Sequence, residues 1–123
     1  MRKAAKNTLA VSNFTYSYNR VISSSRGPCE DGRLKPDISG TGASQQSTGV
    51  NNNYQNAGGT SAAAPGVAGV AALMYQAYKN NNGGSNPSSG LIKGILLNSA
   101  DDVGRPGPDF DFGWGRVNAR RAY

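Results

Sequence analysis

The sequence predicts an α/β fold in which short strands come first and two helices follow. Before residue 60 the apolar residues form short clusters between turns, and after it they recur with the 3.6-residue period of a helix. Leu, Ile, Val and Phe supply only about one residue in six, below the roughly 20% under which disorder is suspected. These residues come in ordered clusters, however, which favours a folded chain with an incomplete core. At 123 residues the chain can hold one domain at most, and we expect another segment to complete its core.

The first predicted strands are short. We expect Thr8–Val11, then Val21 and Ile22, to be extended, because their apolar residues lie between polar turn residues. A further strand is expected over 34–39, where Pro36 confines it to a strand start or a sheet edge.

A polar stretch over 41–56 follows these strands. Its three consecutive asparagines, Asn51–Asn53, favour a turn, because Asn tolerates left-handed backbone and bonds to its own main chain. We therefore expect a hairpin between Ser47–Val50 and Tyr54–Gln55.

Two helices are expected in the second half of the chain. The first runs from about Ser61 to Lys79, and its small opening residues let other backbone approach closely, with Pro65 tolerated near the helix start. The second opens at 87–89 and runs to about Ala100. The apolar faces consist of Val67, Val70, Ala71, Met74, Tyr75 and Tyr78 in the first helix and Leu91, Ile92, Ile95 and Leu96 in the second. A loop is expected over 104–115, and Asn118 is expected to cap a short terminal helix.

The charge balance and residue counts exclude several functions. The chain has 13 Lys and Arg against 7 Asp and Glu, a formal charge of +6, but it carries no nucleic-acid-binding motif. Because it contains no histidine, it cannot hold a self-contained Ser-His-Asp triad. No apolar run predicts a membrane span or a signal peptide. Cys29 is the single cysteine of the sequence and cannot form an internal disulfide.

The residues that indicate a chemical site lie at the predicted start of the first long helix. The string Gly58–Gly69, GGTSAAAPGVAG, places Ser61 at a helix N-terminus, where backbone N–H groups are unpaired and the helix dipole is positive. This position suits an anion, a helix cap, or a nucleophilic hydroxyl beside its own oxyanion donor. A Walker phosphate loop is excluded, because no Gly-Lys-Ser/Thr follows the glycines. The other three alternatives remain open at this point.

Several segments, in one order along the chain, resemble the subtilisin-like serine proteases. The string GGTSAAAPGVAGVAAL is similar to the family's nucleophile segment, in which Gly-Thr-Ser-x-Ala-x-Pro opens a buried helix. Residues 23–39 are similar to its Ser-Ser-Arg-Gly-Pro, Asp-Gly-Arg and Lys-Pro-Asp stretch, and residues 6–13 to the strand before it. Residues 91–102 are similar to the next helix, and residues 108–122 to the Gly-Trp-Gly-x-Val-Asn closing segment.

The resemblance implies that residues 1–123 form the C-terminal part of a three-layer α/β/α domain with a mainly parallel sheet. It implies Ser61 as the catalytic nucleophile, the Ser61 backbone N–H as an oxyanion donor and Thr60 as a neighbouring contributor. The family's triad Asp and His segments precede the matched region, so we expect the chain alone to be inactive. In a complete domain it would be a secreted serine endopeptidase that cleaves protein or peptide substrates without a cofactor.

The same resemblance leaves the acidic residues without a catalytic role. Asp37 matches the structural aspartate of Lys-Pro-Asp, and the cluster of Asp101, Asp102, Asp109 and Asp111 matches turn residues. Calcium is possible in a complete domain, but the sequence assigns no metal site to this chain.

Two alternatives remain beside this hypothesis. The sedolisins, a related family that uses Glu and Asp in place of His, also carry Gly-Gly-Thr-Ser-Ala-x-x-Pro. From another class of function, the chain would be a non-catalytic interaction or assembly module. We expect the chain to associate with a complementary N-terminal half or with itself, and not with nucleic acid or membrane.

Overall fold

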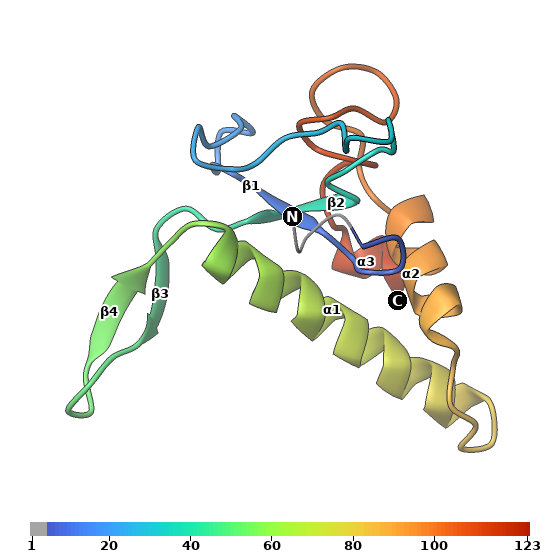
Figure 1. The fold of residues 1–123 in the computed structure, drawn as a ribbon. Coiled ribbons are helices and arrows are strands. Elements are labelled where there is room, and N and C mark those ends of the chain that lie inside the picture. The colour runs from blue at the N-terminus through green and yellow to red at the C-terminus, as the bar shows by residue number, and fades with distance from the viewer. Residues whose placement is uncertain (1–4) are drawn as a thin grey trace.

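The computed structural model describes residues 5–123 of the chain (Figure 1). Within them, one parallel and one antiparallel pair of strands precede three helices, which confirms the predicted order. The elements are β1 (Val11–Phe14), β2 (Ile38–Thr41), β3 (Gln45–Thr48), β4 (Tyr54–Ala57), α1 (Thr60–Asn81), α2 (Ser89–Asn98) and α3 (Ala119–Ala122). None of the helices in this described part has the length and apolarity needed to cross a membrane.

β1 and β2 form the parallel pair, with Val11 opposite Ile38. We expected strands at Thr8–Val11 and 34–39, and both begin later than predicted. The reason is a side chain: the Asp37 carboxylate accepts the Ala10 N–H at 2.6 Å, where a regular ladder would offer a backbone carbonyl. The Asp37 N–H still donates to Ala10 O at 2.8 Å, but the regular ladder of the two strands starts one residue later, with Val11 opposite Ile38.

The predicted strand at Val21 and Ile22 is wrong. The Val21 N–H donates to the Asn13 carbonyl at 3.1 Å, but Ile22 lies in a turn and is 91% exposed. The Arg20 guanidinium donates to the carbonyl oxygens of Val21, Ile22 and Ser24. These hydrogen bonds between residues at most four positions apart hold the segment in a turn against the β propensity of its residues.

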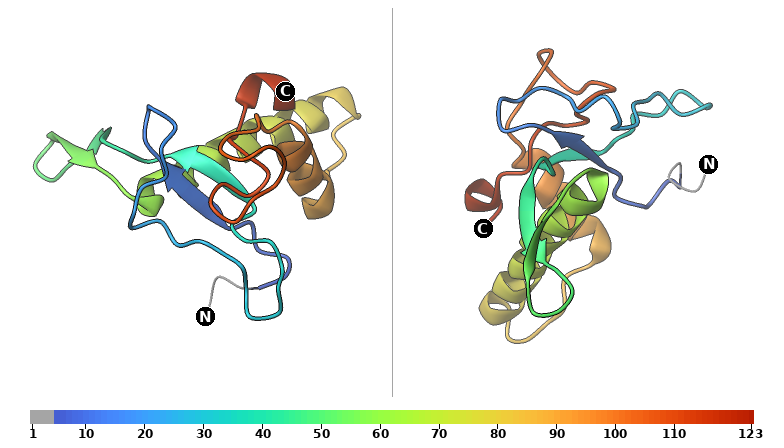
Figure 2. Two further views of the ribbon diagram at one scale, coloured as in Figure 1. Left: turned by 90° about the horizontal axis from the view of Figure 1, so that it is seen from above. Right: turned by 90° about the vertical axis from the view of Figure 1, so that its left-hand side faces the viewer.

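The predicted hairpin is confirmed. β3 and β4 pair antiparallel, with Gln45 opposite Ala57, and the connecting Asn51 and Asn52 have positive φ angles of 57° and 53°. Val50, which we expected in the strand, lies in the turn and is 80% exposed. In Figures 1 and 2 the hairpin extends away from the body of the chain, from the end at which α1 begins.

α1 packs against both β1 and β2 (Figure 2). The core combines buried side chains of α1 and β2 with one from α2. The observed bounds of α1 agree with the prediction to within two residues. Val67 and Met74, on the predicted apolar face, are buried with Ile38 and Leu96 in one cluster. Tyr75, on the same face, is 39% exposed, so the chain covers this face only in part.

α2 begins where the sequence predicts, and Ser88 caps it by accepting the Leu91 N–H at 3.2 Å. The chain then returns through the predicted loop to the edge of β2. There the Ser39 N–H donates to Gly115 O at 2.8 Å, and the Val117 N–H donates to Ser39 O at 2.9 Å. The closing segment is thereby joined to the sheet on which α1 lies.

The terminal helix α3 is capped as predicted. The Asn118 side chain accepts the Arg121 N–H at 3.0 Å and also donates to the carboxylate of Asp101 at 2.9 Å. One asparagine thus begins α3 and ties it to the end of α2.

Candidate active site

Ser61 is the second residue of α1, and its side chain is exposed. Together with Thr60 and Ala64 it lines a pocket of about 690 Å³. The other walls come from the segment around β1 and from the loop and turn residues before β2, namely Thr8, Leu9, Ala10, Val11, Ser25, Arg26, Gly27, Pro28, Cys29, Lys35 and Pro36. The sequence predicted Ser61 and Thr60 but not these walls.

The N-terminus of α1 has no side-chain cap, and Ser61 does not serve as one. The N-cap residue is Gly59, whose φ of +83° suits glycine. The N–H groups of Ala62 and Ala63 both donate to Gly59 O, at 3.0 and 3.2 Å. Within the described chain, the N–H groups of Thr60 and Ser61 donate to no acceptor. The cap alternative is therefore wrong, while a nucleophile beside its own oxyanion donor fits.

Gly42, just after β2, fixes where this helix starts. The Gly59 N–H donates to Gly42 O at 2.8 Å. A Cβ atom on Gly42 would overlap the Gly59 carbonyl oxygen and would lie 2.8 Å from the Ala63 nitrogen. Only glycine permits this close approach, so the end of β2 sets the path of the backbone that leads into Ser61.

Asp37 is held by cations and is not among the residues that line the pocket of Ser61. Its carboxylate accepts hydrogen bonds from Lys35 Nζ at 2.5 Å and from the Ala10 N–H, and it forms an ion pair with Lys93 Nζ at 2.9 Å. Lys35 Nζ also donates to Thr8 O at 2.7 Å. Burial alone would raise the pKa of Asp37, but these donors outweigh it and hold the pKa below its ordinary value. The group joins the segments before β1 and β2, in the structural role that the resemblance implied.

The four aspartates near the C-terminus do not form one site. Asp101 binds basic partners of the closing segment, and Asp111 forms ion pairs with Arg20 and Arg26 at 3.0 and 3.3 Å. Asp102 and Asp109 accept backbone N–H groups in their own loop. In the part of the chain that the structure describes, no three His, Cys, Asp or Glu side chains are placed to hold a metal ion. Their partners match the turn role expected from the sequence.

Within the described residues, neither a histidine nor a carboxylate side chain lines the pocket that contains Ser61. Its titratable lining side chains, within the described residues, are Arg26, Cys29 and Lys35, and Lys35 is bound to Asp37. Cys29 is a half-buried free thiol. The described part of this pocket therefore presents a hydroxyl beside a backbone N–H that donates to no acceptor.

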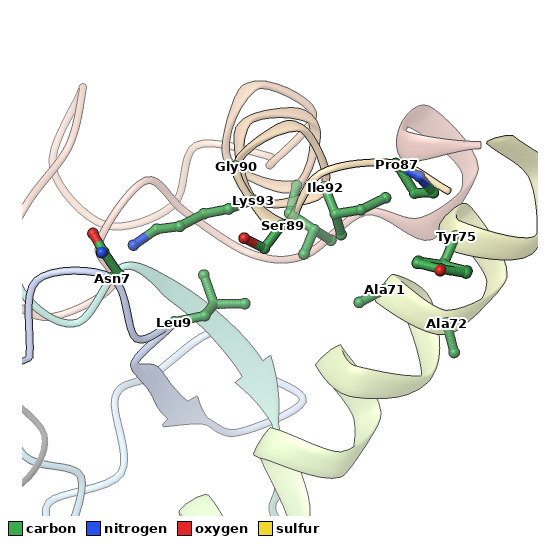
Figure 3. Close-up of a pocket in the computed structure, with 11 residues that line it drawn as sticks. Asn7, Leu9, Ala71, Ala72, Tyr75, Pro87, Ser89, Gly90, Ile92 and Lys93 are labelled. Atoms are coloured by element: carbon green, nitrogen blue, oxygen red, sulfur yellow. The ribbon is translucent and has the colours of Figure 1, made fainter. Parts of the chain in front are cut away.

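A second, larger pocket lies between α1 and α2 (Figure 3). It has a volume of about 890 Å³, and its lining includes Leu9, Ala72, Tyr75 and Ile92 but neither Ser61 nor Thr60. Figure 3 shows the α1 and α2 side chains on two sides of this space and Leu9 on a third. The described residues that line this pocket include no histidine, carboxylate or thiol that could act on Ser61.

Comparison with known proteins decides the family. The model of the subtilase family, peptidase family S8, matches residues 2–115. This chain belongs to the subtilase family. Among its relatives, an extracellular serine protease of Serratia marcescens is 42% identical over 73 residues, which are 59% of this chain and 6% of that protein. C5a peptidase of Streptococcus pyogenes is 39% identical over 79 residues, 63% of this chain and 7% of that protein.

Solved structures of subtilisin-like proteases share the fold of this subtilase chain. A lanthipeptide protease matches with a TM-score of 0.82 at 26% identity, over 99% of this chain and 42% of that one. The CspB protease of Clostridium perfringens matches with a TM-score of 0.85 at 27% identity, over 96% of this chain and 26% of that one. The predicted α/β subtilisin-like fold is confirmed. The chain spans less than half of these structures and under a tenth of the two relatives named above.

Proposed function

We propose that this subtilase chain supplies the nucleophile of a serine endopeptidase, with Ser61 as the attacking residue. The observation that carries the proposal is the uncapped start of α1, where an exposed hydroxyl lies in a pocket beside its own unpaired backbone N–H. Ser61 Oγ would attack the scissile carbonyl carbon of a peptide. The oxygen that becomes negative would accept the Ser61 N–H, with Thr60 contributing at its side.

The proton acceptor in this proposal is a histidine outside the 123 residues, because the sequence contains none. That histidine would take the Ser61 proton during attack, and an aspartate would orient its ring. The hydrolysis needs no cofactor. Without the base, a helix N-terminus does not make serine a strong nucleophile, so the chain alone is expected to be inactive.

We propose that the base arrives on a complementary segment of a subtilisin-like domain. Exposed apolar side chains support this, among them Leu73 at 56% and Leu91 at 39%, together with the open pocket between α1 and α2. A helix without a charged residue from Thr60 to Tyr78 is typical of the interior of a larger body. The Serratia relative is named as extracellular, and we propose the same location for this protein.

The test is assembly. The chain is combined or co-expressed with a segment carrying the aspartate and histidine of a subtilisin-like domain, and cleavage of an unstructured peptide is measured. We expect activity that Ser61→Ala abolishes, by about 10⁶-fold for a triad nucleophile. Ser85→Ala, in the exposed linker after α1, should leave it unchanged. We call this combination the assembled enzyme.

A non-catalytic assembly module is the second candidate, favoured by the absence of histidine from the sequence. It predicts that the complementary segment binds while Ser61→Ala changes no turnover. Binding without any Ser61-dependent cleavage would replace the first proposal by this one.

A further inference from the structure

We propose that Asn13 is a positioning residue for Ser61, which acts by placing its side-chain oxygen at the positive end of α1. The inference rests on the proposed function, because it concerns how the proposed nucleophile is held. Asn13 lies in β1, opposite Gly40 of β2, and its side chain is 2% exposed.

The Asn13 side chain is unusual because its oxygen is buried without a partner. Oδ1 makes no hydrogen bond within the described residues. The Asn13 backbone, in contrast, is fixed on both sides, since its N–H donates to Ser24 Oγ at 2.9 Å and its carbonyl accepts the Val21 N–H. Buried polar side chains in proteins are normally paired, and leaving one unpaired costs about 1–3 kcal/mol. A buried asparagine with this free-energy cost suggests that its side-chain oxygen has a function.

The position of Asn13 Oδ1 suggests what that function is. Oδ1 of Asn13 lies 2.8 Å from the place where a Cβ atom on Gly42 would sit. The same point is 2.8 Å from the Ala63 nitrogen and closer still to Gly59 O. The amide oxygen therefore lies beside the first turn of α1, where the helix dipole favours negative charge.

An ordinary side-chain cap at the start of α1 could occupy the Ser61 N–H that the proposed oxyanion needs. A capping side chain accepts the N–H of the second or third helical residue, and the second residue of α1 is Ser61. α2 and α3 have such caps, on Ser88 and Asn118. At α1 the partial negative charge comes instead from the neighbouring strand, and the Ser61 N–H stays free for the oxyanion.

The test compares two buried polar residues of one strand in the assembled enzyme. Asn13→Leu removes the oxygen at similar volume, and it should lower kcat by about tenfold or more while KM stays within about twofold. The matched control is Ser12→Ala. Ser12 is 1% exposed and its hydroxyl pairs with that of Ser39 at 2.7 Å, so this change should lower stability but leave kcat within about twofold.

Two further variants test whether the oxygen itself matters and replace Asn13→Leu if that variant does not fold. Asn13→Asp keeps an oxygen at the helix end and should retain most of the kcat that Asn13→Leu loses. If leucine prevents folding, Asn13→Ala removes the amide without added bulk and should show the same loss. An unchanged kcat in folded Asn13→Leu or Asn13→Ala, an equal loss in Ser12→Ala, or an Asn13→Asp enzyme as slow as Asn13→Leu would each overturn the proposal. Ser61→Ala is measured alongside, so failure of the proposed function is seen separately.

Discussion

The carboxylate of Asp101 should hold the C-terminal segment in place, and its replacement should release that segment. Asp101 follows α2 and binds three side chains of the closing segment. Its oxygens accept Arg116 Nη2 at 2.5 Å, Asn118 Nδ2 at 2.9 Å and Arg121 Nη1 at 3.2 Å. Asp101→Asn removes the charge and weakens all three contacts.

The size of the effect follows from the pKa of this carboxyl. The hydrogen bond from Arg116, followed by that from Asn118, lowers the pKa of Asp101 from 3.8 to about 2. That difference corresponds to roughly 2 kcal/mol at neutral pH. Because the Asp101 side chain is 24% exposed, solvent screening reduces the expected contribution to about 1–2 kcal/mol.

Hydrogen exchange of residues 113–123 measures this contribution as a local opening free energy. Asp101→Asn should speed exchange there by about 5- to 30-fold at pH 7, while exchange in the middle of α1 stays unchanged. Since the pKa of Asp101 is lowered in the folded chain, its contribution is complete above about pH 4 and is lost as the pH falls through 2. The protection of residues 113–123, corrected for intrinsic rates, should decline over that interval in the parent chain and stay flat in Asp101→Asn.

Asp102→Asn is the matched control. Asp102 is exposed, and its carboxylate accepts only the Gly107 N–H within the described residues. It should leave the exchange of 113–123 within about twofold of the parent. An equal acceleration in both variants, or none in Asp101→Asn, would show that the ion pairs of Asp101 do not hold the segment.

Three further outcomes are expected. The 123-residue chain alone should not react with a fluorophosphonate probe, as intact mass would show, and ready labelling at Ser61 would reveal a base within the chain. The same chain should bind a hydrophobic dye or associate, because Leu73 and Tyr75 are exposed, and a sharp monomeric two-state melt in calorimetry would contradict this. Gly42→Ala should destabilise the assembled enzyme by about 1–3 kcal/mol, because the added methyl group overpacks against Gly59. The midpoint of thermal unfolding should fall accordingly, and a midpoint equal to the parent's would refute the close approach.

The sequence predicted α1 and the β3–β4 hairpin, because both depend on interactions between residues that are close along the chain. α1 follows from a 3.6-residue apolar repeat, and the hairpin follows from Asn51 and Asn52, whose side chains tolerate positive φ. The strand bounds did not follow, because β2 starts only after Asp37 has taken the Ala10 N–H. A side chain that replaces a ladder partner from another part of the chain leaves no periodic trace in the sequence.

The candidate site divides in the same way. The string around Ser61 placed a hydroxyl at a helix start, and the structure has it there. Whether that hydroxyl caps the helix depends on Gly42, which lies on another element and sets the path of Gly59. The pocket walls and Asn13 come from the segment around β1 and the turns before β2, so no spacing along the chain could bring them together.

The distribution of satisfied polar groups also bears on the choice between enzyme and assembly module. Several polar groups away from Ser61 are paired: Ser88 and Asn118 cap their helices, and Asp101 is bound by three side chains. At the start of α1, the Ser61 N–H and Asn13 Oδ1 are unpaired within the described chain. A side-chain cap there would stabilise the helix by about 1 kcal/mol. A module kept only for docking gains from such a cap, whereas an enzyme that uses the Ser61 N–H loses its oxyanion donor, so the uncapped helix favours chemistry at Ser61.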